Sequence, residues 1–511
     1  MSDFETRRQI LKVTAGGALA GIGGYAFLRG LPPVSAAETK LAAKQVRLSP
    51  SIEPLVQLIE KTPRNALLET IALRIRKGLS YRQTLAALLL TGVRNVQPRP
   101  AVGFKFHAVL VVNSAHLASL SSPDSDRWLP IFWALDYCKS KQLEEERTSG
   151  WKLPPVDEKS VPPASRAKKA LIDALEKWDE QAADAATASL ARSAGSNEIF
   201  EILFRYGSRD FRSIGHKAIF VANSRRTLSC IGWQHAEPVL RSLVYAMLNH
   251  RGEPNPAKSD LTPDRPFRRN LELAGKIRKD YRDGKLNASA TRDLLSTLRT
   301  GSSNDACDLA VKLLNSGVSP QSVWDAVFVG SGELLMRQPG IIGLHTLTTA
   351  NAMHHAYSAT GDDTTRRLLL LQSCAFLPMF RATASRRGRI KDLSVKDIKS
   401  TPLDQKTGDE KIGEIFADVS RDRMKAAGKI RRYLADGGSA RPIINAARRL
   451  IFSKGRDAHD YKFSSAVLED YYNVSGEFRD EFLALSVFNL KGSGHRDNPL
   501  VKQIRSALKS K

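Results

Sequence analysis

The chain has 511 residues, of which 42% are hydrophobic and 26% charged, a composition that excludes a disordered or fibrous protein. The formal net charge of +25 raises the question of a polyanionic partner. Lysine and arginine are spread over the whole length, however, and the basic runs around Arg387 and Arg431 lack interleaved aromatic residues. This pattern argues against nucleic-acid binding and favours a generally basic, solvated surface.

The first 36 residues are typical of an export signal. Arg7 and Arg8 begin a pattern that resembles the bacterial twin-arginine signal and continues through Lys12 into a glycine- and alanine-rich apolar stretch. Ala36 closes a small-residue cleavage site. We therefore expect residues 1–36 to be a signal peptide, although an amphipathic helix or a retained anchor would share some of these features.

Several expectations follow from this signal. The partner in export would be the Tat (twin-arginine) machinery, and the mature protein would reside in the periplasm or outside the cell. No later stretch looks long and apolar enough to span a membrane, so we expect no membrane span after signal cleavage.

The four cysteines lie singly within apolar helical patterns, which predicts free thiols rather than a metal or haem motif.

Apolar residues recur at helical spacing along nearly the whole chain, and alternating strand patterns are scarce, so we predict an all-α protein. Three polar, proline-bearing stretches are predicted linkers: residues 144–165, 251–268 and 385–412. The linkers separate four predicted helical blocks: residues 37–143, 166–250, 269–384 and 413–511.

The four blocks resemble one another, which indicates about four divergent helical repeats. In each, an apolar helix leads to a glycine-containing loop, a histidine opens a second helix, and a third apolar helix follows a turn. The glycines are Gly103, Gly215, Gly343 and Gly455. The helix-opening histidines are His107, His216, His345 and His459.

A histidine in the first turn of a helix lies at the positive end of the helix dipole, which favours neutral imidazole. Neutral imidazole ligates metals and acts as a general base. If the four first turns meet, the four histidines are candidate catalytic residues and candidate ligands of one transition metal, such as iron, copper or zinc.

Further polar residues follow the histidines on nearly the same helix faces. Lys462 lies three residues after His459, and we add it to the candidate catalytic residues. The candidate substrate-binding residues are Asn113, Asn223, Thr348 and Asn351. A structural alternative stays open, in which the histidines fill junctions between repeats and the asparagines bridge helices.

Four short segments carry a family resemblance: FHAVL, GHKAIFVA, LHTLTTANAM and AHDYKFSSA, each containing one of the four histidines. In this order they resemble the questin oxidase-like family, to which enzymes of anthraquinone breakdown belong. The resemblance implies an all-helical protein that inserts oxygen into an aromatic ketone or quinone, with NADPH as the electron source.

The sequence thus predicts an exported all-helical enzyme, questin oxidase-like, that oxidises a hydrophobic, aromatic or quinone small molecule in a histidine-lined cavity. The alternative is a non-catalytic helical-repeat protein of the cell envelope. In that case the basic surface would bind anionic polymers, and the histidines would be structural.

Overall fold

The computed structural model describes residues 48–98, 105–248 and 253–509, all within one compact unit that spans residues 45–511. The predicted all-α class is confirmed, because the described residues form helices and no β-strand. Their only β feature is an isolated bridge between Lys285 and Val318. The predicted signal peptide and its cleavage site lie outside the described residues.

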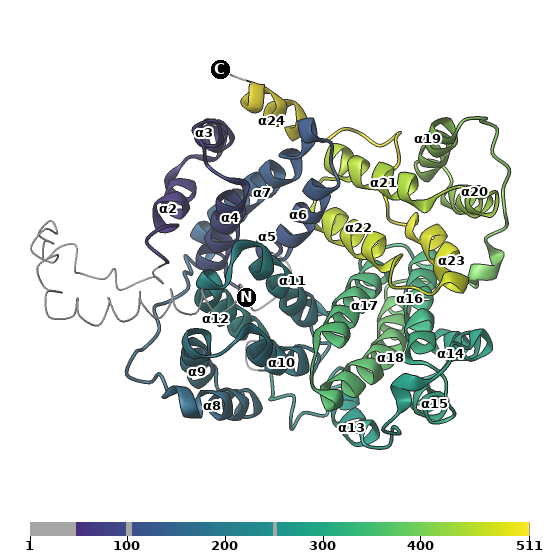
Figure 1. The fold of residues 1–511 in the computed structure, drawn as a ribbon, viewed down its shortest axis with the longest axis horizontal. Helices are drawn as coiled ribbons and strands as arrows, with labels where there is room; N and C mark the ends of the chain where they lie inside the picture. The colour runs from purple at the N-terminus through teal and green to yellow at the C-terminus, as the bar shows by residue number, and fades with distance from the viewer. Residues whose placement is uncertain (1–47, 99–104, 249–252, 510–511) are drawn as a thin grey trace, which may run out of the picture. The chain divides into compact units, whose positions relative to one another are not determined.

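The helices fall into four successive sets along the chain (Figure 1). The first set is α2 (Glu53–Lys61), α3 (Arg64–Arg76), α4 (Tyr81–Asn95), α5 (His107–Leu110), α6 (Val112–Leu120) and α7 (Leu129–Thr148). The second set is α8 (Ala164–Lys177), α9 (Glu180–Ser193), α10 (Ser196–Gly207), α11 (His216–Ile231) and α12 (Ala236–Met247).

The second half of the chain continues in the same way. The third set is α13 (Arg265–Ala274), α14 (Ala288–Thr300), α15 (Ser303–Asn315), α16 (Pro320–Arg337), α17 (Ile341–Ala359) and α18 (Asp363–Ser385). The fourth set is α19 (Gly408–Val419), α20 (Arg423–Ala435), α21 (Ala440–Lys454), α22 (Ala458–Asp470) and α23 (Gly476–Ser486), and α24 (Leu500–Lys509) ends the described chain.

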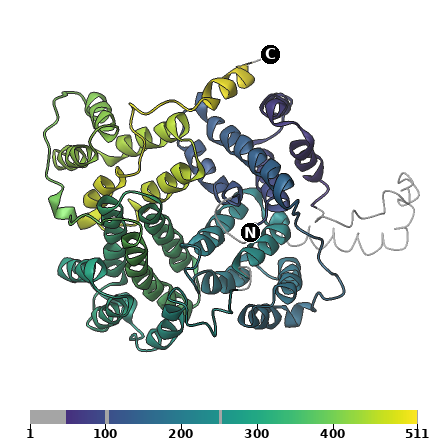
Figure 2. The ribbon, with the colours of Figure 1, turned by 180° about the vertical axis from the view of Figure 1, so that it is seen from behind.

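One helix from each set contributes to a closed central ring. Helix α6 contacts α11, α11 contacts α17, α17 contacts α22, and α22 returns to α6. The colours of the ribbon therefore follow the chain around this ring, and the last set lies beside the first (Figures 1 and 2). The four predicted histidine-bearing segments thus lie on neighbouring central helices.

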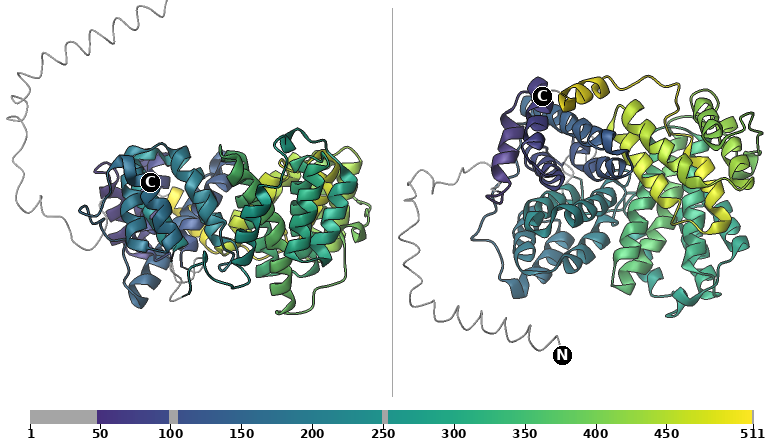
Figure 3. Two further views of the ribbon diagram at one scale, coloured as in Figure 1. Left: turned by 90° about the horizontal axis from the view of Figure 1, so that it is seen from below. Right: turned by 45° about the horizontal axis from the view of Figure 1, so that its top comes forward.

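The outer helices surround the central ones (Figure 3), and they repeat a similar pattern of contacts. Each central helix packs between the helix before it and the helix after it. In three sets the helix directly before the central helix also contacts the last helix of another set: α10 with α18, α16 with α23, and α21 with α7. In the first set α4, which precedes the short helix α5, makes this contact with α12. Because these contacts recur, the four central helices have similar neighbours.

Helix α18 is long and apolar enough, by length and composition alone, to cross a membrane, with a mean hydropathy of 1.2. The expectation that no stretch after the signal reaches this threshold is therefore wrong for α18. In the fold, 72% of that apolar window is buried, and Leu368, Leu369, Leu370 and Leu371 are fully covered. Here α18 packs as a core helix against α17, α15 and α13.

Candidate metal centre

The four predicted histidines meet in the middle of the ring. His107, His216, His345 and His459 each offer one ring nitrogen, and these four atoms all lie within 4.8 Å of one another. The Nε2 atom of His216 is 3.4 Å from that of His107 and 3.1 Å from that of His345. The prediction of one shared site depended on this convergence. We call these four residues the histidine cluster.

The rings follow one another in chain order around the cluster. Ring centroids are 5.1 Å apart for His107 and His216, 4.6 Å for His216 and His345, 5.3 Å for His345 and His459, and 4.4 Å for His459 and His107. The cyclic order matches the order of the central helices, so each set of helices places one imidazole.

Helix starts position three of the four rings. His107 and His216 are the first residues of α5 and α11, and His459 is the second residue of α22. The side chain of Asp457 caps α22 by accepting hydrogen bonds from the backbone N–H groups of His459 and Asp460, at 2.7 and 3.2 Å. This cap fixes the first turn that carries His459.

The prediction that His345 opens its helix is wrong by about one turn. Helix α17 begins at Ile341, directly after Gly340, whose φ of 148° lies in the region that favours glycine. Gly343, predicted to lie in a loop, is therefore inside α17, where a Cβ atom would come within 2.8 Å of the Leu335 backbone. Because glycine stands there, α17 packs closely against α16.

Gly215 brings two rings of the cluster together. Its φ of 83° is left-handed, and it directly precedes His216. A Cβ atom on Gly215 would overlap the side chain of Thr349, which lies on α17 one turn after His345. The absence of a side chain at Gly215 thus lets the start of α11 approach α17, which sets the short distance between His216 and His345.

Backbone carbonyls fix the tautomers of two rings. The Nδ1 atom of His216 is 2.6 Å from the carbonyl oxygen of Ser213, and that of His345 is 2.7 Å from the carbonyl oxygen of Ile341. A carbonyl oxygen can only accept, so both Nδ1 atoms carry the proton and both Nε2 atoms present a lone pair. This is the arrangement in which protein imidazoles bind metal ions.

His459 has a related partner. Its Nδ1 atom is 3.5 Å from a carboxylate oxygen of Asp457. A carboxylate behind a ligating imidazole orients the ring and raises its basicity as a ligand. The sequence interpretation missed Asp457, Ser213 and the Ile341 carbonyl. An aspartate two residues before a helical histidine is a capping signal that points to Asp457, but backbone carbonyls leave no mark in a sequence.

Two of the Nε2 separations are compatible with coordination of one metal ion. Two Nε2 lone pairs 3.1 Å apart repel each other unless a cation or a proton lies between them. In a tetrahedral site with metal–nitrogen bonds of about 2.0–2.1 Å, neighbouring nitrogens are about 3.3–3.4 Å apart. The distances from His216 to His107 and to His345 are close to that value. An imidazole-rich donor set suits zinc, copper and iron.

Burial keeps three of these imidazoles neutral. His107, His216 and His345 are at most 5% exposed, and burial lowers the pKa of each well below its ordinary value. The charge of Lys462 lowers all three pKa values further. Desolvation is thus the largest cause of the lowered pKa values, whereas the sequence pattern had suggested the helix dipole as the cause. The His459 side chain is 27% exposed and forms the accessible edge of the cluster.

Lys462 is buried close to the cluster, one turn after His459 on α22. The residue is 2% exposed, and burial lowers the pKa of its amine to about 7. Its Nζ atom has no hydrogen-bond partner among the described residues. A buried ammonium without a partner costs free energy, so its retention points to a role other than stability.

The predicted substrate-binding residues are buried on the central helices. Asn223 donates to the carbonyl oxygen of Leu110 at 2.9 Å, and Asn351 donates to the carboxylates of Glu469 and Asp470 at 2.7 and 2.9 Å. These contacts join α11 to α5 and α17 to α22, as the helix-bridging alternative describes.

The other two members of that set make no such bridge in the described contacts. Thr348 is 3.4 Å from the backbone carbonyl oxygens of Leu344 and His345 in its own helix, and Asn113 is buried on α6.

The other described histidines lie outside the cluster. His116 lies between the Tyr81 hydroxyl and the Cys230 thiol, at 2.9 and 3.3 Å, and joins α6 to α4 and α11. His354 packs edge-on against Trp324, and burial lowers its pKa to about 4. These residues offer metal-free controls for substitutions in the cluster.

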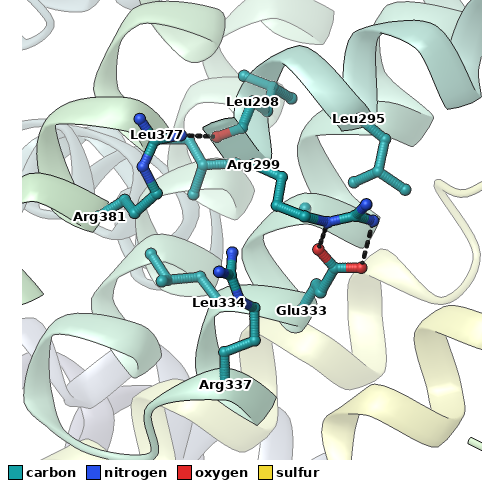
Figure 4. Close-up of a pocket in the computed structure, with 9 residues that line it drawn as sticks. Leu295, Leu298, Arg299, Glu333, Leu334, Arg337, Leu377 and Arg381 are labelled. Atoms are coloured by element: carbon teal, nitrogen blue, oxygen red, sulfur yellow. Dashed lines mark hydrogen bonds and ion pairs between the residues drawn. The ribbon is translucent and has the colours of Figure 1, made fainter. Parts of the chain in front are cut away.

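Three cavities lie away from the histidines. The cavity in Figure 4, between α14, α16 and α18, has a volume of about 10 Å³, roughly that of one water molecule, beside the paired Arg299 and Glu333. Two surface grooves, of about 630 and 650 Å³, lie between α19 and α21 and along α2 and α3. No residue of the histidine cluster lines any of the three.

Comparison of the chain with protein-family models, curated proteins and solved structures finds no match.

Proposed function

We propose that this protein is an exported, metal-dependent oxidoreductase in which His107, His216, His345 and His459 hold one transition-metal ion. The observation that carries this proposal is the convergence of four imidazole nitrogens within 4.8 Å. Structural histidines at junctions between repeats have no need to share one centre. Structural histidines also have no need for two Nδ1–H groups that donate to backbone carbonyls and so leave two Nε2 lone pairs facing each other.

The proposal includes four divergent helical repeats, each contributing one ligand. The recurring helix contacts support this interpretation, since each central helix has the same three kinds of neighbour. The cyclic order of the four rings supports it as well. Four copies of one histidine-bearing helical unit, arranged in a ring, would together supply the four ligands of the centre.

The ion would supply one-electron chemistry if it is iron or copper, whereas zinc has no redox chemistry in proteins. The residues of the chain would tune that chemistry. The carbonyls of Ser213 and Ile341 hold two rings in the ligating tautomer, and Asp457 orients His459. Lys462 would stabilise negative charge that develops beside the centre.

The substrate proposal comes from the sequence resemblance. The likeness to the questin oxidase-like family supports a hydrophobic substrate, an aromatic ketone or a quinone, with NADPH as the reductant. Such a molecule would approach at His459, because its side chain is the exposed edge of the cluster. The N-terminal resemblance supports export by the Tat machinery to the periplasm or the cell exterior.

The competing function is a non-catalytic envelope protein that binds anionic polymers through its basic surface. The net charge of +25 favours it. This function would make polymer binding sensitive to salt and indifferent to alanine substitutions in the histidine cluster.

Metal content tests the proposed function first. Elemental analysis of protein produced in its native host should find about one transition-metal ion per chain. His216→Ala and His345→Ala should lose that ion, while His354→Ala, at a partly buried histidine outside the cluster, should keep it. Oxygen uptake with quinones and aromatic ketones then tests the reaction. Metal-free wild-type protein that stays folded would refute the metal centre.

A further inference from the structure

Lys462 differs from the other buried lysines of the described chain. Four lysines there are buried: Lys139, Lys217, Lys429 and Lys462. Lys217 pairs with Asp210 at 2.6 Å, Lys429 pairs with Glu414 and Asp418, and Lys139 donates to the carbonyl oxygen of Glu60 at 2.6 Å. Of these four, only Lys462 has an Nζ atom without a hydrogen-bond partner among the described residues.

The position of Lys462 on α22 places it near the histidine cluster. It follows His459 by three residues on α22, so the two side chains lie on neighbouring positions of one helix face. That helix contacts α5, α6 and α17, which carry or adjoin the segments of His107 and His345. The effect of the Lys462 charge on His107, His216 and His345 agrees with this placement.

The charges around the cluster are unbalanced. All four metal ligands are imidazoles, which bring no negative charge to a divalent ion. In the part of the chain that the structure describes, the carboxylate in recorded contact with the cluster is Asp457, which is 62% exposed and also caps α22. A divalent ion and a charged Lys462 ammonium would therefore repel each other in a buried site, and an anion between them would relieve that repulsion.

We propose that Lys462 and the metal centre together bind a small anion, whose acceptor atoms meet the ammonium on one side and the ion on the other. This inference rests on the proposed metal centre and names a ligand class for it: monoanions of two to four heavy atoms, such as azide, bicarbonate or superoxide. A charge-assisted hydrogen bond from Lys462 would hold the anion and satisfy Nζ.

Burial limits the size of this ligand. Three of the four rings are at most 5% exposed, and Lys462 is 2% exposed. Side chains buried this closely leave too little room for an aromatic ring between them. The partly exposed His459 edge is where a ligand can enter. A larger organic substrate would meet the centre at that edge, while the anion lies deeper, toward Lys462.

Azide binding to the copper- or cobalt-loaded protein tests the inference, followed through the visible absorption of the metal. We expect saturable binding by the wild type and binding at least about tenfold weaker in Lys462→Met, with unchanged metal content. Lys462→Arg should recover part of the affinity, because it restores a buried cation. Lys429→Met, a buried lysine away from the cluster, should bind azide as the wild type does.

The outcomes separate this inference from the proposed function. Full metal loading with equal azide affinity in the wild type and Lys462→Met would refute the anion site and leave the metal centre standing. Metal-loaded wild-type protein that binds no azide would refute it too. Failure of the folded wild type to bind any metal would instead refute the proposed function. Bicarbonate in place of azide should give the same order of affinities among the variants.

Discussion

The Nε2 atom of His345 lies 3.1 Å from the Nε2 atom of His216, although 129 positions separate the two residues in the chain. Both rings donate Nδ1–H to a backbone carbonyl, so two lone pairs face each other in a buried site. The backbone around Gly215 makes this approach possible, since a side chain there would overlap Thr349.

Gly215→Ala should therefore weaken metal binding. The new methyl group would push the start of α11 away from α17 and separate His216 from His345. Gly437 is a matched control, because it has the same φ of 83° but open space around its Cβ position. Gly437→Ala should cost about 1–2 kcal/mol of unfolding free energy from backbone strain alone.

Gly215→Ala should cost about 1–3 kcal/mol more than this control, from overpacking. Chemical denaturation measures the unfolding free energy of both variants, and calorimetric titration with zinc measures their metal affinity. The double variant Gly215→Ala with Thr349→Gly should recover part of the affinity. Equal metal affinity in Gly215→Ala and the wild type would show that this contact does not position the rings.

The metal-free protein should lose stability as the pH falls below about 6.5, the ordinary pKa of histidine in an unfolded chain. The pKa of His345 is well below that value in the folded state, so the unfolded state binds the proton first. Its contribution to stability is present above pH 6.5 and is lost progressively below it, by up to about 1.4 kcal/mol per pH unit.

Urea unfolding of metal-free wild type and His345→Leu between pH 5 and 7.5 measures this effect. The variant should show a shallower pH dependence, by about one proton. Identical slopes for the two proteins would contradict the assignment of a neutral, buried His345.

Lys462→Met should stabilise the metal-free protein at pH 7, by about 1–3 kcal/mol. Methionine fills a similar volume and removes a buried amine that has no hydrogen-bond partner among the described residues. A gain in stability together with a loss of anion affinity is the signature of a functional residue. Thermal and chemical unfolding measure it, and a loss of stability would show that Lys462 has a structural partner.

Asn351→Ala should destabilise the fold without removing the metal. The substitution removes one of the donors to the buried carboxylate of Asp470 and one of the acceptors of the Arg226 guanidinium. We expect a cost of about 1–3 kcal/mol. Asn445→Ala, at a partly exposed position of α21 with no side-chain hydrogen bond among the described residues, should change stability by less than about 0.5 kcal/mol. Metal loss in folded Asn351→Ala would show that the asparagines belong to the centre after all.

The all-helical class and the four converging residues were predictable from the sequence. Helical spacing of apolar residues indicated the class, and the recurrence of one histidine in one context singled out His107, His216, His345 and His459 among ten histidines. The placement of Lys462 beside His459 was predictable for a different reason, because a residue three positions later lies on the same helix face.

Other features depended on contacts between distant segments. The start of α17 at Ile341 was missed because Gly343 resembles a loop glycine in sequence, whereas in the fold it allows close packing against Leu335. The Nδ1 partners of two rings are backbone carbonyls, which any residue supplies. The bridging roles of Asn223 and Asn351 depend on which helices the closed ring places side by side, and no local pattern encodes that.

Anomalous diffraction from crystals of the natively produced protein is the most direct test of the central claim. The account predicts one strong peak at the absorption edge of a transition metal, within bonding distance of nitrogens from His107, His216, His345 and His459. The same four rings converging with no anomalous peak between them, in folded protein kept free of chelators, would contradict it.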